Sequence, residues 1–316
     1  MISQEHNRQY MDFYCRIERH SISPLGQELL SFVITAPRCI LAEVNTHTVI
    51  SKNTSSSRAI PYSRVMPRKP TQPPSMREMV LENPYLPLYW GRNEAGMQAT
   101  TELNAEEISL CKEEILLGRD RAVQMCDRLW KIGMHKQDIN RYLEPWSWFT
   151  QILTSCFWSN FFALRTHKDA HPAFRKVARQ MYIQYINSYP QRLNYGQWHL
   201  PFTDERDYNE WKYPDLLKIS VARCARLSYN TFDGVRDTTK DFELYEKLSG
   251  SYPKHMSPFG HQGTPQHRGQ TGWSGNFYGW TQYRKQIVGE NILEFKPSND
   301  ELRQWIAEEE CRASAA

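Results

Sequence analysis

Hydroxyl side chains, one histidine and one arginine crowd into a single short segment, residues 46–58, which reads THTVISKNTSSSR. Ser and Thr hydroxyls donate hydrogen bonds to phosphate oxygens, and an arginine such as Arg58 offers a two-pronged fork to the same oxygens. The composition therefore indicates a site for a phosphorylated ligand with a polar ring. A Ser/Thr-rich surface loop has the same composition, and composition alone favours that simpler interpretation.

A second arginine, Arg165, follows the apolar residues 146–164, which we expect to form a buried helix. An unpaired guanidinium in such surroundings costs several kcal/mol. We therefore expect Arg165 to face a ligand that carries or develops negative charge. The alternative is an ion pair at the C-terminal end of that helix.

Charge and composition exclude several classes of protein. The net charge of +4 comes without a Lys/Arg run, which favours small anionic ligands over nucleic acid. The seven cysteines form no C-x-x-C pair, and the chain has neither a G-x-G-x-x-G nor a P-loop motif. His167 and His171 lack the Glu of a zinc motif, so we expect no metal site.

The N-terminal residues are polar, which predicts no signal peptide, and no apolar stretch reaches membrane-spanning length. We expect a cytoplasmic protein with reduced thiols and no membrane partner.

Local patterns predict the elements that must position these residues. Residues 28–40 are expected to form a strand, and 217–229 are strand-like. A capping-box pattern at Asn104 and Glu107 predicts a helix that ends near Gly133. Further helices are expected from Pro172 onward and over 240–248. The Pro-rich residues 61–100 are expected to form a long surface loop and a candidate lid.

Residues 46–58 resemble the signature R-H-R-x-x-S-x-N-x-x-S-x-R of the flavin-dependent thymidylate synthases (ThyX). The matching residues are His47, Ser51, Asn53, Ser56 and Arg58.

Three more segments extend the resemblance. Ala36-Pro37 matches an upstream A-P, residues 140–145 resemble A-R-x-x-L-P, and residues 160–165 resemble N-F-x-x-L-R.

The segments with which common members of this family begin resemble residues near the C-terminus here. Residues 225–229 resemble A-R-V-S-F, 241–248 resemble the following helix, and 254–261 resemble G-H-x-T-P-F-E-H. The resemblance therefore predicts a circularly permuted member of the longer type that is typical of bacteriophages.

The resemblance implies an α+β fold in which helices wrap a curved mixed or antiparallel sheet. It implies one catalytic domain over residues 1–316, with strands and signature loop in 1–60, the Pro-rich loop in 61–100, a helical part in 101–190 and the permuted segment in 215–292. It also implies a homotetramer with sites between subunits, placed in the host cytoplasm if a phage encodes the chain.

The implied reaction converts dUMP to dTMP, with 5,10-methylenetetrahydrofolate as carbon donor, FADH2 as hydride donor and NADPH to reduce the flavin. Arg165 and Ser56 are the implied catalytic residues. The implied dUMP-binding residues are Glu43, Ser55, Ser56, Arg58, Arg141 and Arg165. The implied FAD-binding residues are Thr46, His47, Thr48, Asn160, His255, Ser257 and Arg284.

The chain also departs from the family pattern. Thr46 and Thr48 replace both arginines beside His47, and Glu43 stands where a Gln is usual. We expect Arg284, in a Gln-aromatic-Arg segment, to replace the missing charge. The altered residues leave two alternatives open, a hydroxymethylase that forms 5-hydroxymethyl-dUMP and an inactive nucleotide-binding protein. No cysteine lies in a P-C-H context, which favours a mechanism without an enzyme thiolate.

Overall fold

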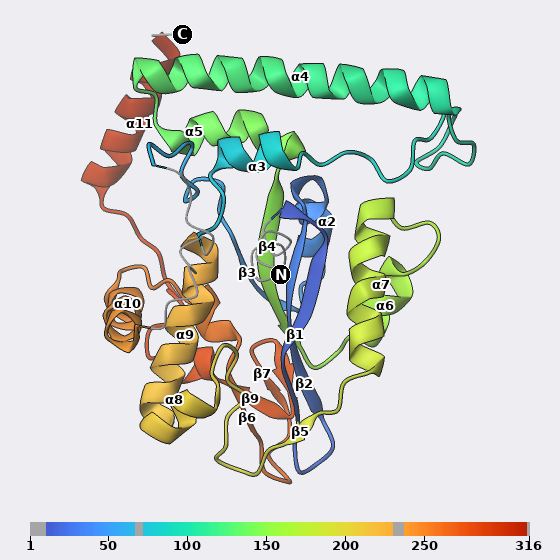
Figure 1. Cartoon of the computed structure of the whole chain (residues 1–316). Coiled ribbons are helices and arrows are strands. Elements are labelled where there is room, and N and C mark those ends of the chain that lie inside the picture. The colour runs from blue at the N-terminus through green and yellow to red at the C-terminus, as the bar shows by residue number, and fades with distance from the viewer. Residues whose placement is uncertain (1–10, 67–71, 230–236, 315–316) are drawn as a thin grey trace.

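A five-stranded mixed sheet forms the centre of the computed structural model, which describes residues 11–66, 72–229 and 237–314. The strand order is β3-β4-β2-β1-β5 (Figure 1). β5 pairs with β1 in parallel, and the other neighbours pair antiparallel. The five strands are β1 (Tyr14–Ile22), β2 (Glu28–Pro37), β3 (Ser51–Thr54), β4 (Trp148–Ser155) and β5 (Gln191–Arg192).

The hairpin of β1 and β2 begins the sheet. Gly26 occupies the turn with a φ of +88°, a conformation that favours glycine, and the Ser23 amide donates to the Gln27 carbonyl. Every residue of β2 after Glu28 is buried, as its central position requires. The strand predicted over residues 28–40 is thus confirmed up to Pro37. Arg38–Ile40 instead form a 3-10 turn (η1) that leads into α2 (Leu41–Asn45).

The helix predicted over residues 146–164 is wrong for most of its length. Trp148–Ser155 form β4, and only Ser159–Arg165 are helical, as α6. All eight residues of β4 are buried, since it lies between β2 and β3 with both faces covered. A strand buried on both faces shows no alternation of apolar and polar residues, so its sequence looks like that of a buried helix.

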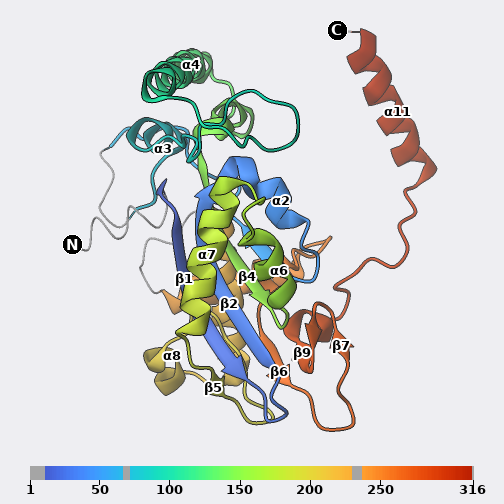
Figure 2. The ribbon, with the colours of Figure 1, turned by 90° about the vertical axis from the view of Figure 1, so that its right-hand side faces the viewer.

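Two helices, α6 and α7 (Pro172–Ile186), cover one face of the sheet (Figure 2). Pro172 begins α7, as predicted, because a first-turn residue needs no backbone N–H. Phe32 and Ile34 of β2 belong to the core on this side, together with Phe174 of α7.

The opposite face is covered by α9 (Tyr213–Tyr229), with α8 (Glu205–Glu210) and α10 (Thr238–Gly250) beside it. α10 confirms the helix predicted over residues 240–248. The strand predicted over 217–229 is wrong, because this stretch is the main part of α9. Arg223 explains the error: it is buried in α9 and ion-paired with Asp207 (2.6 Å) and Asp241 (3.1 Å), so polar and apolar positions do not separate into two faces.

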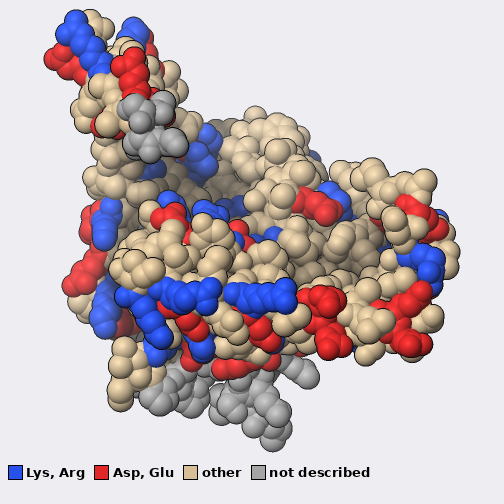
Figure 3. All heavy atoms as spheres, turned by 90° about the horizontal axis from the view of Figure 1, so that it is seen from above, with Lys and Arg blue, Asp and Glu red and all other residues tan. Residues whose placement is uncertain are grey.

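Helices also lie across one end of the sheet. They are α3 (Met76–Glu82), α4 (Ala105–Ile132), α5 (Lys136–Ile139) and the 3-10 segment η2 (Asn140–Trp146). The capping box of Asn104 and Glu107 begins α4 and Gly133 ends it, as predicted. α3 lies inside the stretch 61–100, which was predicted as a loop; the Ser75–Glu78 capping box begins it. Seen from above, both basic and acidic side chains lie on this end of the molecule, with basic ones gathered mainly on the left (Figure 3).

The C-terminal part adds short elements at the other end of the sheet and one outlying helix. They are η3 (Ser257–Gly260), β6 (Gly263–Pro265), β7 (Trp273–Ser274), β8 (Phe277–Tyr278), β9 (Trp280–Gln282), η4 (Tyr283–Gln286) and α11 (Asn299–Ser314).

A buried polar chain ties this part to the sheet. His199 contacts Ser21 (2.9 Å) and Ser31 (2.8 Å), Ser31 contacts Thr154 (2.7 Å), and Thr154 contacts Nδ1 of His261 (2.8 Å).

The architecture confirms the predicted α+β fold with a mixed sheet flanked by helices. No helix within the described ranges is long and apolar enough to cross a membrane.

Candidate functional site

Residues 51–58, the second part of the segment 46–58 singled out in the sequence, run along the edge of the sheet with alternating burial. Ser51, Asn53, Ser55 and Ser57 are buried, whereas the residue that follows each of them is partly or fully exposed. Successive residues of an extended chain point to opposite sides, so one set faces the core and the other faces outward.

The buried set fastens the segment to the body. Asn53 donates through Nδ2 to the Cys224 carbonyl (2.6 Å), and the Ser57 hydroxyl donates to Glu144 (2.5 Å). The Ser55 hydroxyl, at a residue only 4% exposed, accepts a hydrogen bond from the Thr150 amide (3.0 Å). Ser55, a predicted dUMP ligand, therefore has its hydroxyl engaged within the sheet.

The outward set lines a cavity of about 570 Å³. Lys52, Thr54, Ser56 and Arg58 come from this set. Ala225, His255, Ser257 and Pro258 line the same cavity, as do His135 and Gln137.

Two residues that line this cavity are joined by a hydrogen bond from the Ser257 hydroxyl to Oδ1 of Asn53 (3.2 Å). The structure therefore brings predicted site residues from sequence positions some two hundred residues apart into one cavity. Two cations, several hydroxyls and imidazoles make it a suitable site for an anionic ligand.

Arg165, the last residue of α6, is held from three sides. Its Nε donates to Nε2 of His47 (2.8 Å), Nη1 lies 3.2 Å from a Glu43 carboxylate oxygen, and Nη2 lies 3.4 Å from the Thr46 hydroxyl. The guanidinium also stacks over the Phe174 ring, with its carbon 4.6 Å from the ring centroid. These contacts fix the plane of the guanidinium, and they include the helix-end ion pair expected as the alternative.

His47 is neutral in this arrangement. Burial, together with the nearby charges of Arg165 and Lys52, lowers the His47 pKa to about 4. Because Nε2 accepts the hydrogen bond from Arg165, the ring proton resides on Nδ1. The rings of Phe161 (5.0 Å) and Phe174 (6.2 Å) pack edge-on against His47.

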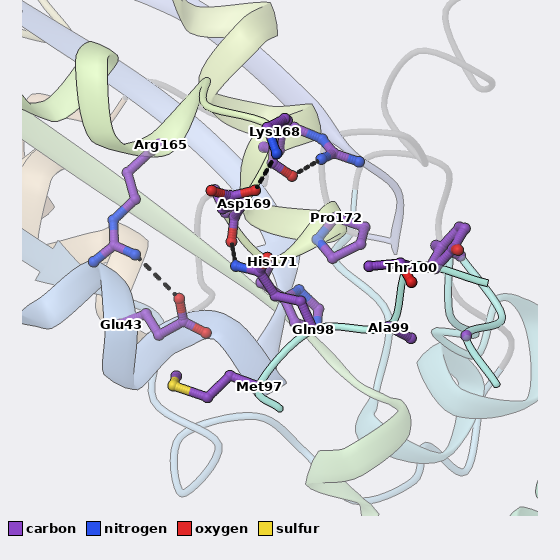
Figure 4. Close-up of a pocket in the computed structure, with 14 residues that line it drawn as sticks. Glu43, Met97, Gln98, Ala99, Thr100, Arg165, Lys168, Asp169, His171 and Pro172 are labelled. Atoms are coloured by element: carbon purple, nitrogen blue, oxygen red, sulfur yellow. Dashed lines mark hydrogen bonds and ion pairs between the residues drawn. The ribbon is translucent and has the colours of Figure 1, made fainter. Parts of the chain in front are cut away.

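Arg165 and Glu43 line a second cavity, of about 760 Å³, which shares no lining residue with the first (Figure 4). Lys168, Asp169, His171 and Arg175, around the start of α7, form another part of its wall. The remaining wall is the loop that carries Tyr89, Gly91 and residues 97–100.

Backbone hydrogen bonds join the two ends of that loop. The Leu103 amide donates to the Trp90 carbonyl (2.8 Å), and the Arg92 amide donates to the Thr101 carbonyl (2.8 Å). The tip is joined to the opposite wall by a hydrogen bond from the Gln98 side chain to the Asp169 carbonyl. The candidate lid within residues 61–100 thus includes a segment that walls the Arg165 cavity.

Arg141 lies outside both cavity linings. Its Nη1 is 3.0 Å from Glu144, the carboxylate that also receives the Ser57 hydroxyl. Beside it, Arg38 is held by the Ser55 and Trp148 carbonyls (3.4 and 3.3 Å), and burial lowers the Arg38 pKa to about 10.

Three other predicted cofactor ligands lie elsewhere. Asn160 is exposed in the first turn of α6, and the Thr48 carbonyl accepts from the Asn276 side chain (2.9 Å). Arg284 is ion-paired with Glu290 (2.6 Å), so its charge already has a partner. The same C-terminal segment does reach the signature, but through Gln282, whose Nε2 donates to the Ser51 hydroxyl (2.9 Å).

Sequence reasoning missed Lys52, His135, Lys168, Arg175 and Tyr89 as cavity residues. Lys52 carried a usable signal, since it alternates with Thr54, Ser56 and Arg58 at the two-residue period of a strand. The other four come from segments whose approach to the site is set by tertiary structure.

Solved structures to which this chain is similar include a UMP/dUMP methylase PolB from Streptomyces cacaoi. Its crystal structure bound with 5-Br UMP aligns at 16% identity over 56% of this chain and 89% of that chain, with a TM-score of 0.44. The structure bound with 5-Br dUMP aligns at 15% identity over 56% of this chain and 92% of that chain, with a TM-score of 0.41.

No curated protein sequence matches the chain. The family model described as Thy1, thymidylate synthase complementing protein, matches residues 1–191 of the 316. That match covers more than half of the chain and includes residues 46–58, Arg141 and Arg165. It ends before the residues 215–292, so their permuted origin stays a prediction. The chain belongs to the thymidylate synthase complementing protein family, Thy1, the family of the flavin-dependent thymidylate synthases.

Proposed function

We propose that the protein methylates C5 of dUMP to give dTMP, with 5,10-methylenetetrahydrofolate as the carbon donor. Membership of the Thy1 family supports methylation of a uracil nucleotide. The observation that carries the proposal for this chain is the fixed guanidinium of Arg165 at the wall of a 760 Å³ cavity.

Arg165 would activate the uracil ring. C5 becomes nucleophilic when negative charge on the ring is stabilised at its carbonyl oxygens. A guanidinium remains charged at neutral pH, and its contacts with His47, Glu43 and Thr46 hold it in place before the substrate arrives. Little reorganisation is then required when charge develops on the ring.

Ser56 and Arg58 would bind the nucleotide's polar groups. Both line the 570 Å³ cavity, where Lys52 adds a second cation that the sequence comparison had not assigned. Arg141 would bind the phosphate after exchanging its contact with Glu144 for a phosphate oxygen. Glu43 would accept hydrogen bonds from the ring N–H, and Ser55 would act by fixing the strand.

The donor set also fits a flavin nucleotide. His255 and Ser257 face the cationic cavity that Lys52 and Arg58 line, which suits the diphosphate of FAD. Thr46, Thr48, His47 and Asn160 would contact the flavin's polar edge, and Arg284 would do so only after leaving Glu290. When bound and reduced by NADPH, FAD supplies the hydride that completes the methyl group.

Assembly as a homotetramer, with sites between subunits, is part of the proposal. Some predicted ligands line two cavities without a common residue, and others, including Arg141, Asn160 and Arg284, line neither. A complete site requires Arg165 and Ser56 to meet the same nucleotide. A second copy that brings its Ser56 cavity toward the Arg165 cavity of the first would satisfy that requirement.

A permuted domain is also proposed, with residues 1–316 acting as one catalytic unit. The contact of Ser257 with Asn53 supports it, since the proposed permuted segment shares a cavity with the signature.

The test begins with the purified protein and FAD. We expect retained flavin with its yellow absorbance, and conversion of dUMP to a product heavier by one CH2 when methylenetetrahydrofolate and NADPH are present. A product heavier by CH2O would identify the hydroxymethylase, whereas dUMP binding without turnover would identify a binding protein. Either result would overturn dTMP formation.

Arg165→Lys is the matched variant, because it keeps the charge and loses the planar fork. We expect its kcat to fall by about a hundredfold or more, the scale of removing one transition-state donor, with dUMP binding less affected. An unchanged kcat would remove the basis for assigning ring activation to Arg165.

A further inference from the structure

The C-terminal helix α11 presents an apolar face that, among the described residues, stays largely exposed. Leu302, Trp305 and Ile306 follow one another at helical spacing and are 40%, 43% and 59% exposed. The side chains of residues 299–311 are all exposed, although Phe295 stacks on Trp305. An isolated helix of this length is marginal in water and is normally stabilised by packing of such a face.

α11 stands apart from the rest of the molecule. In Figures 1 and 2 it extends away from the body at the end of the segment 287–298, and in Figure 3 it projects at the upper left. α7 lies on a different side of the body in both ribbon views. In this arrangement, α11 therefore cannot reach the surface of α7 in its own chain.

The distribution of charge along α11 indicates what kind of surface it can bind. Residues 299–314 contain five carboxylates and two arginines, a formal net charge of −3, and three of the carboxylates are consecutive at positions 308–310. Glu308 and Glu310 have no cationic partner among the described residues. Asp300 and Glu301 in the first turn already contact Arg303 and the Ser298 amide, and beyond this turn α11 is first apolar and then acidic.

α7 has the complementary pattern. Arg175, Lys176 and Arg179 have no carboxylate partner within the described chain; they contact the Lys168 carbonyl, the Phe13 ring and the Thr166 carbonyl, respectively. The helix itself contains no acidic residue.

The following turns of α7 expose apolar side chains, namely Tyr182 (44%), Ile183 (57%) and Ile186 (60%). From its N-terminal end, α7 is thus first basic and then apolar.

We propose that α11 of one copy packs antiparallel against α7 of a second copy of this chain. Antiparallel alignment places Trp305 and Ile306 against Ile183 and Ile186, and the acidic turn 308–310 against the basic turns of α7. The charged and apolar centres are about 7 Å apart along α11 and about 10 Å apart along α7, a difference that long lysine and arginine side chains can span, so both contacts form together. The C-terminal end of α11 also meets the N-terminal end of α7, which favours the pairing of their dipoles.

The decisive experiment joins the two helices with a carbodiimide, which couples a lysine amine directly to a contacting carboxylate. In the wild-type protein, we expect a cross-linked peptide between Lys176 and one of Glu308, Glu309 and Glu310. The adjacent pair Lys285 and Glu290 serves as an internal control, because its contact lies within one chain.

Two co-expressed variants then show whether the contact joins separate copies. One chain carries Lys176→Arg, and the other carries Glu308→Gln, Glu309→Gln and Glu310→Gln. Neither chain alone can form the cross-link. With both present, the intact acidic turn of the first can couple only to Lys176 of the second.

We expect the two chains to co-purify and the cross-link to reappear. A cross-link in the wild-type protein but not in the two co-expressed variants would mean that α11 binds α7 of its own chain. That result would overturn the proposal. Three other results would also overturn it. The cross-link could be absent from both samples although Lys285 and Glu290 are coupled, Lys176 could couple to another protein, or the two chains could fail to co-purify.

Discussion

Nε of Arg165 lies 2.8 Å from Nε2 of His47, and this hydrogen bond joins the end of α6 to the signature segment. It makes the histidine an acceptor that orients the guanidinium. Two residues identified from separate motifs therefore act as one unit, together with Glu43 and Thr46.

Removal of the acceptor at position 47 should lower activity without removing the charge of Arg165. We expect His47→Leu to reduce kcat/KM for dUMP by about ten- to a hundredfold, because a hydrogen bond to a charged group contributes about 1.5–3 kcal/mol. His47→Gln retains an acceptor oxygen and should lose less. Steady-state kinetics with saturating flavin measure both, and equal losses in the two variants would contradict the orienting role.

Acid should destabilise the protein through its buried histidines. Burial lowers the pKa of His261 to about 3 and that of His199 well below its ordinary value. In the unfolded chain both titrate near 6.5, so between about pH 6.5 and 3 the unfolded state binds more protons. The free energy of unfolding is therefore expected to fall as the pH falls, by a few kcal/mol in total.

His261→Gln removes one of these two titrating groups. Denaturant unfolding measured from pH 7 to pH 4 should show a shallower dependence on pH for this variant than for the wild type. Parallel curves would show that His261 does not cause the acid sensitivity.

The stability of the fold should depend strongly on the buried ion cluster around Arg223. Its guanidinium pairs with Asp207 and Asp241 under the sheet, and removal of one partner leaves the other charges buried. We expect Arg223→Met to lower the free energy of unfolding by about 3–5 kcal/mol.

Lys218→Met is the matched control. Lys218 lies on the same helix and pairs with exposed Glu246 at 3.4 Å, a type of contact that contributes about 1 kcal/mol or less. Comparable losses in the two variants would contradict the special cost of the buried cluster.

Gly91 should be required for the loop that walls the Arg165 cavity. A Cβ at this position would lie 2.2 Å from the Cβ of Ala99, so the two sides of the loop must separate. We expect Gly91→Ala to raise the KM for dUMP about tenfold, which corresponds to a loss of about 1.4 kcal/mol in binding free energy. The change in thermal stability should be small. Gly250→Ala, which meets nothing within 4 Å, is the control, and unchanged kinetics of Gly91→Ala would argue against a role for the loop.

Elements with local determinants were predictable from the sequence. The Asn104 capping box, the first-turn proline of α7 and the α10 helix all lie where predicted. In each case a cap or an amphipathic period encodes the element within a few residues.

The failures share a physical cause. β4 is apolar because both of its faces are covered, and α9 mixes polar with apolar positions because Arg223 is neutralised by residues of α8 and α10. Neither covering layer is visible in the local sequence. The candidate site shows the same limit, since Arg165 and Ser56 belong to matched motifs but line different cavities of one chain.

The alternation of buried and exposed side chains along residues 51–58 limits how this stretch can change in length. Loss or gain of one residue would turn Lys52, Thr54 and Ser56 inward and bring the hydroxyls that fasten the sheet into solvent. Such a change would disable folding and ligand contact at once, whereas a change of two residues would preserve the facing of those that remain. Natural variants of this stretch should therefore differ in length by even steps.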